Sequence, residues 1–248
     1  MTDSDAQHWC IWFRAYLEKI KGTVEVWAGS VDFAENLLTS RGIGFVLEAF
    51  SEHRVPIAVL KLHHNRIAEG TSLAAFLGRC EGTLQELHLS HNELDAKGSA
   101  EIIAAAAKST EADGSHCYPR MESVRGSVPL WVRLEQNHVD QGTFVEIMDS
   151  QYAELKRDGV ERVFCDASSK WCTPHSCAGA NQAGSTPAVH LKNLQQQRRR
   201  AASGTATDSS QVSTAATSSS SSSGSGTTTS SAALPEGTEV AKILRWDW

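Results

Sequence analysis

The chain has 248 residues and a net charge of −6. This acidic balance argues against a general nucleic-acid binder and against a protein held on an anionic membrane surface. The six cysteines are irregularly spaced, and neither a secretory leader nor an 18-residue apolar run is present, so we expect a protein of a reducing compartment, the cytoplasm or the nucleus.

Residues 1–23 are predicted to form an amphipathic helix. Its aromatic and aliphatic side chains recur at helical spacing on one face, as Trp9, Trp12, Tyr16 and Ile20. Such a helix could lie on a membrane surface, but its polar face is poor in Lys and Arg. We therefore expect a capping helix that covers the apolar end of the domain that follows.

One motif occurs four times within residues 24–150. The first copy reads Val31-x-Phe33-x-x-Asn36-x-Leu38, and each later copy keeps the apolar alternation and the asparagine. The asparagines are Asn36, Asn65, Asn92 and Asn137. An apolar stripe at helical spacing follows each copy, which predicts a strand and then a helix in every unit.

This pattern resembles the leucine-rich repeats of the ribonuclease-inhibitor type. The resemblance implies an α/β solenoid with short parallel β-strands on a concave face and helices on a convex face. The four asparagines are then structural, because each amide can bond backbone groups of an adjacent turn. Asn92 and Asn137 lie 45 residues apart, and we expect the excess, at about 109–128, to be an inserted loop.

Residues 151–197 are predicted to form a degenerate repeat and a C-terminal cap. Val160, Val163 and Cys165 match the apolar half of the motif, and Ser168 stands where the asparagine would be. Terminal repeats are commonly atypical. In this interpretation Cys165 points into the core, and Phe164 points outward.

The last 51 residues have a different composition. Residues 201–233 contain 13 Ser and 7 Thr with Asp208 as the only charge, which predicts a disordered linker over 198–235. Residues 236–248 form an apolar peptide that ends in Trp246 and Trp248. Exposed Trp is adhesive, so this peptide either docks on its own domain or binds another protein.

The outward positions of the predicted strands form rows, of which one is Asp32, Lys61, His88 and Arg133. Arg and aromatic side chains are frequent interface anchors, so we predict that a protein partner binds this face. The predicted contact residues are Lys61, His63, His88, Trp131, Arg133, Glu135 and Phe164. The histidines of this face could form a pH-sensitive or zinc-binding patch, but we expect an ordinary solvated surface, because parallel strands spread side chains apart.

Cys172, His175, Cys177 and His190 have the ligand types of a zinc site. Cys165 precedes them at a spacing that could add a ligand, but the predicted degenerate strand assigns it to the core. Their spacing is irregular, and the signal is weaker than that of paired Cys-x2-Cys motifs. We therefore predict neither a metal nor another cofactor.

No phosphate-binding loop, nucleophile elbow or metalloprotease motif is present. We predict a monomeric, non-enzymatic scaffold that binds a protein partner. The resemblance also includes the Ran GTPase-activating proteins, which use similar repeats and an arginine to stabilise phosphoryl transfer, and Arg133 would be the best placed residue for that role. RNA binding through Arg198–Arg200 is a third alternative, but this run lacks interleaved aromatic residues, so nucleic acid is not the expected partner.

Overall fold

The structure is a computed structural model. It describes residues 1–156, 163–166, 172–177, 186–192 and 242–246, with backbone only for the last of these ranges. The predicted linker at 198–235, the Arg198–Arg200 run, Val160 and Ser168 lie outside the described residues.

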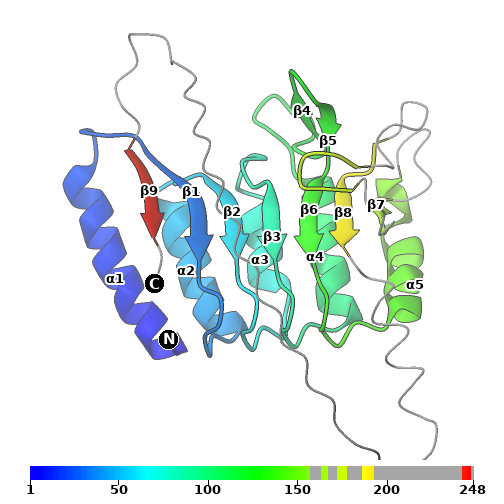
Figure 1. The fold of residues 1–248 in the computed structure, drawn as a ribbon, viewed down its shortest axis with the longest axis horizontal. Coiled ribbons are helices and arrows are strands. Elements are labelled where there is room, and N and C mark those ends of the chain that lie inside the picture. The colour runs from blue at the N-terminus through cyan, green and yellow to red at the C-terminus, as the bar shows by residue number, and fades with distance from the viewer. Residues whose placement is uncertain (157–162, 167–171, 178–185, 193–241, 247–248) are drawn as a thin grey trace, which may run out of the picture.

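A parallel sheet runs through the molecule (Figure 1). Six of its strands lie in the order β1-β2-β3-β6-β8-β7, and β9 pairs in parallel with the outer edge of β1. These strands are β1 (Val26–Asp32), β2 (Ile57–Lys61), β3 (Glu86–His88), β6 (Leu130–Arg133), β7 (Phe164–Cys165), β8 (Val189–Lys192) and β9 (Lys242–Trp246).

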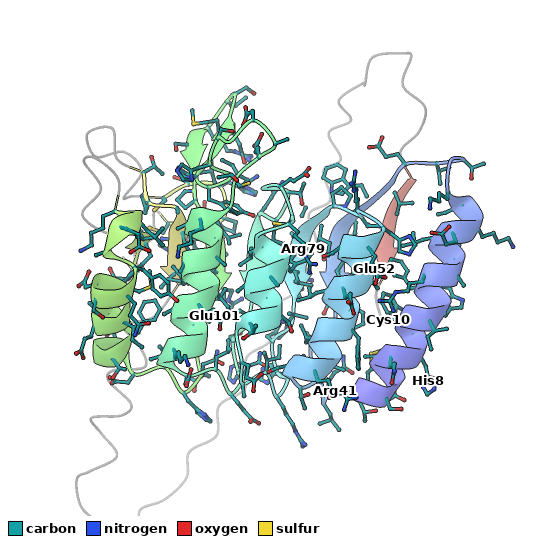
Figure 2. All side chains as sticks on the ribbon, turned by 180° about the vertical axis from the view of Figure 1, so that it is seen from behind. His8, Cys10, Arg41, Glu52, Arg79 and Glu101 are labelled. Carbon is teal, nitrogen blue, oxygen red and sulfur yellow. The ribbon has the colours of Figure 1, made fainter. Side chains whose placement is uncertain are left out.

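Helices cover one face of the sheet, and the other face carries none in the part of the chain that is described (Figures 1 and 2). The helices are α1 (Asp3–Ile20), α2 (Ser40–Glu52), α3 (Thr71–Leu77), α4 (Ala96–Lys108), α5 (Gln141–Gln151) and the short 3-10 helix η1 (Ala153–Leu155). Side-chain caps begin four of them: Thr2, Thr39, Asp95 and Asp140 each accept a hydrogen bond from a backbone N–H of the first turn.

The core lies between the sheet and the helices. The inward residues of the motif strands, such as Leu60, Leu87 and Val132, are fully buried. The helical stripes meet them, with Ile43 and Ile103 among the buried residues. The predicted N-terminal helix is α1, which packs Trp9 against Phe13, Phe33 and Phe50.

The motif asparagines connect successive turns. The Asn65 side-chain oxygen accepts from the Leu38 backbone N–H at 3.0 Å, and its amide nitrogen donates to the Phe33 carbonyl at 2.8 Å. Asn92 bonds the Ile67 N–H and the Leu62 carbonyl in the same way. Asn137 repeats the pattern toward Leu94 and Leu89. Each of these three asparagines therefore replaces water as the partner of buried backbone groups.

The prediction of a leucine-rich-repeat solenoid is wrong. In a solenoid each unit contacts only its neighbours along the chain, but here β8 lies between β6 and β7, and β9, the last strand, lies beside β1, the first. The order of the strands in the sheet therefore differs from their order in the chain. The molecule is an α/β fold with a parallel sheet, and the description of it as a repeat protein is wrong as well. The strand predicted around Val163 and Cys165 is β7, but it does not pair with β6, because β8 lies between the two.

Residues 109–128 lie between α4 and β6, as an insertion there requires, but they are not only a loop. They contain an antiparallel hairpin of β4 (Arg120–Glu122) and β5 (Gly126–Val128). The hairpin is anchored by Tyr118, which is fully buried and donates a hydrogen bond from its hydroxyl to the Leu84 carbonyl at 2.8 Å.

No helix among the described residues is both long and apolar enough to cross a bilayer.

Candidate functional site

The open face, as we call the helix-free face of the sheet, presents two rows of side chains in register. One row is Asp32, Lys61, His88, Arg133 and Lys192. The other is Ser30, Val59, Glu86, Trp131, His190 and Cys165. Both rows follow the predicted outward positions as far as β6. On β7 the prediction placed Phe164 at this position instead of Cys165, and the contribution of β8 was not predicted.

Ion pairs fix the charged side chains of the open face. Lys61 Nζ lies 3.1 Å from Asp32 Oδ2, and Arg133 Nε donates to Glu135 Oε1 at 3.1 Å. Partial burial opposes ionisation of Asp32, but hydrogen bonds from the Ala34 backbone N–H and from Lys61 outweigh it and lower the pKa of this carboxyl. The carboxylates are therefore held close to cations and do not leave a bare negative surface.

Four histidines meet in the middle of the open face, and we call His63, His64, His88 and His91 the histidine group. The His64 and His91 rings stack at 4.0 Å, and the His63 and His88 rings lie 6.4 Å apart. Burial lowers the pKa of both His63 and His88, although the Glu86 hydrogen bond to His88 at 3.0 Å acts in the opposite direction. These two imidazoles are therefore neutral at neutral pH.

The histidine group shows no metal geometry. Within the described residues, the single set of three or more potential ligands that converges lies elsewhere on the sheet. His64 and His91 are exposed and have positive φ angles, as do Glu35 and Gln136 at the corresponding position before the other two motif asparagines. The backbone adopts the left-handed conformation at these four positions. The motif has no glycine there, so the sequence gives no sign of this conformation.

Trp131 is on the open face as predicted, but it is not an exposed anchor. Only 4% of its surface is accessible, and its ring stacks on His190 with a centroid distance of 4.6 Å. The Lys192 ammonium lies 5.6 Å from the same ring. Trp131 therefore has a packing role at this end of the sheet, contrary to the prediction.

Phe164 does not lie on the open face at all. It is buried in the core on the helix side, where its ring meets Phe144 edge to face at 5.2 Å. A shift of one residue reverses the face of every side chain in a strand, so Cys165 takes the outward position that was assigned to Phe164. The prediction that Cys165 points into the core is therefore wrong.

A cysteine–histidine cluster occupies the β7–β8 end of the open face. Cys165, Cys172, Cys177 and His190 each place one potential ligand atom so that all four atoms lie within 4.8 Å of one another. Three of these residues belong to the weak zinc set considered from the sequence. His175 of that set is exposed and outside the cluster, and Cys165, which the prediction assigned to the core, takes its place.

Comparison with protein-family models and with curated proteins finds no match to this chain. The functional argument therefore depends on the geometry of the open face and of the cysteine–histidine cluster.

Proposed function

We propose that this protein is a non-catalytic binding module that holds a protein partner on the open face, between β1 and β6. The observation that supports the proposal is the asymmetry of the sheet. One face is buried under helices, while the other presents ordered charged and imidazole side chains. Because ion pairs and ring stacking already hold these side chains in place, they would lose little conformational entropy when a partner binds.

The charge of this face suggests what the partner offers. The chain as a whole is acidic, with a net charge of −6, whereas Lys61, Arg133 and Lys192 lie in one row of the open face. The side chains of Lys61 and Arg133 are 34% and 37% exposed. Arg133 uses Nε toward Glu135, and the outer edge of a guanidinium is suited to a bidentate carboxylate. The partner we propose therefore presents Asp or Glu side chains to this row.

Charge reversal tests the proposal. Immobilised full-length chain would be used to capture partners from a cell extract, and each captured protein would then be purified and its affinity measured directly. We expect Lys61→Glu combined with Arg133→Glu to weaken binding by at least about tenfold, as opposing charges at an interface do. Lys97→Glu combined with Arg41→Glu, on the exposed helix side, is the matched control and should leave the affinity unchanged.

The other outcomes are also informative. Equal loss with both charge pairs would indicate nonspecific electrostatic capture and would exclude the open face as the site. Capture that nuclease treatment abolishes would favour a nucleic-acid partner. If the partner is a GTPase, its hydrolysis rate with the wild-type chain and with Arg133→Ala would separate simple binding from activation.

A further inference from the structure

The cysteine–histidine cluster has a ligand set that the binding proposal does not use. It combines three thiols and one imidazole, which is a common composition of structural zinc sites. We propose that Cys165, Cys172, Cys177 and His190 bind one zinc ion in tetrahedral coordination. This inference is independent of the proposed partner-binding function.

The distances fit that coordination. With Zn–S and Zn–N bonds of about 2.3 and 2.05 Å, ligand atoms of a tetrahedral site lie roughly 3.6–3.8 Å apart. The Cys177 sulfur lies 3.6 Å from His190 Nδ1, and all four potential ligand atoms fall within 4.8 Å of one another. Small side-chain adjustments would therefore close the site around an ion.

The backbone brings the ligands together from three segments. Cys165 and His190 are register partners on β7 and β8. Cys172 and Cys177 flank a tight turn in which Thr173 and Ser176 exchange backbone hydrogen bonds of 2.7 and 3.1 Å. The turn points its two cysteines toward the strand pair, so an ion would connect the turn, β7 and β8.

His190 provides a second and independent indication. The residue is 1% exposed, and its Nδ1 lies 3.6 Å from the Cys177 sulfur, whereas Nε2 has no hydrogen-bond partner among the described residues. A thiol is a weak partner for a buried imidazole nitrogen. A metal bond at Nδ1 would give this ring a strong partner inside the cluster, while Nε2 would remain without one. Trp131, stacked on the ring at 17°, holds the imidazole in place.

The alternative chemistry for these residues is a disulfide. None of the three cysteines forms a disulfide in the structure, and a disulfide would join two of them and leave the third thiol and the histidine without a role. Four convergent ligands with no open position fit a structural ion better than a catalytic one. Zinc in that site would secure the β7–β8 end of the sheet and the packing of Trp131.

Elemental analysis of the full chain, purified under reducing conditions without chelator, tests the proposal. We expect about one zinc per chain. Replacement by Co²⁺ should give the strong visible bands of tetrahedral thiolate coordination and a sulfur-to-metal charge-transfer band. Because these measurements use wild-type protein, they do not depend on whether a variant folds.

Matched variants then assign the ligands. Cys172→Ser and Cys177→Ser should each lower zinc affinity by at least about 100-fold. Loss of a residue that only hydrogen-bonds a metal ligand lowers metal affinity by about 10- to 100-fold, so a larger loss indicates a direct ligand. His175→Ala, beside the cluster, and Cys80→Ser, a cysteine outside it, should keep the metal. Wild-type chain that binds neither added Zn²⁺ nor Co²⁺ would overturn the proposal. So would a Cys–Cys disulfide within the cluster, or zinc that His175→Ala removes and Cys172→Ser retains.

Discussion

Asn92 shows how much one side chain contributes to the order of this molecule. It is 5% exposed and bonds the Ile67 N–H, the Leu62 carbonyl and the Leu89 carbonyl. The backbone groups belong to two different turns, so the amide supplies hydrogen bonds that neither turn makes alone. Asn36 occupies the corresponding first position, but it is only half-buried, and its amide nitrogen bonds carbonyls of its own turn.

We expect Asn92→Ala to lower the free energy of unfolding by about 1–3 kcal/mol, because it leaves buried backbone groups without partners. Urea unfolding followed by circular dichroism measures the change. Asn36→Ala is the matched control and should cost clearly less, since water can reach the groups that it releases. Equal effects at both positions would mean that burial of the backbone groups is not what gives Asn92 its importance.

Local chemistry of this kind could be predicted from the sequence. The asparagine bonds and the side-chain rows from β1 to β6 follow from the alternation of a strand, which is visible in the motif itself. The burial of Trp131 could not be predicted in this way, because the residue that covers its ring, His190, lies 59 residues further along the chain. Likewise, Cys165 and Phe164 exchange faces through a one-residue shift that a degenerate motif does not determine.

Among the elements, β8 explains most of what was missed. Only four residues long, Val189–Lys192 carries too short an alternation to be recognised as a strand. Nothing in it specifies a place between β6 and β7, since strand order follows from tertiary packing. The wrong solenoid prediction comes in part from the position of this strand, whereas Cys165 was omitted from the metal set because it was expected in the core.

The starts of α3 and α4 touch at Gly70 and Gly98, and this contact sets the spacing of the two helices. A Cβ atom at Gly70 would overlap the carbonyl oxygen of Gly98 and would lie 3.1 Å from the Ile102 side chain. The φ angle of Gly70 is −84°, so the constraint is space and not backbone strain.

Gly70→Ala should therefore destabilise the fold by about 1–3 kcal/mol, as overpacking does. Gly78→Ala, at the other end of α3, is the control, because nothing lies closer than 3.7 Å to its added Cβ. It should be neutral or stabilising by up to about 1 kcal/mol, through the reduced freedom of the unfolded chain. Thermal and urea unfolding of the two variants would measure the difference, and a neutral Gly70→Ala would show that the helix starts can separate freely.

For the whole molecule, two half-buried histidines make stability depend on pH. The pKa values of His63 and His88 are lowered in the folded state from an ordinary 6.5, chiefly by burial. The unfolded chain thus takes up these protons first as the pH falls. The stabilising effect of the neutral imidazoles is complete above pH 6.5 and is lost as the pH falls from there through the folded pKa values.

We accordingly expect the free energy of unfolding to decrease between about pH 7.5 and 5.5. The variant His63→Gln with His88→Gln should show a smaller decrease over the same range, while His8→Gln on α1 should behave like the wild type. Comparison with the wild type removes contributions that all variants share, including that of the cysteine–histidine cluster. An identical pH slope in the double variant would contradict the assignment.

The pairing of β9 with β1 brings distant parts of the chain to one corner of the sheet. Met1 bonds Asn36 and Leu37 just after β1, and Trp246 is in register with Val31 near the end of β1. Figure 1 shows the end of β9 and the start of α1 on the same side of the sheet. A circular permutant is therefore accessible: a short linker could join them, and new ends could open in the exposed 123–125 turn of the β4–β5 hairpin. All strand neighbours would be preserved, and tags or fluorophores on the new ends would leave both the β1 corner and the open face clear.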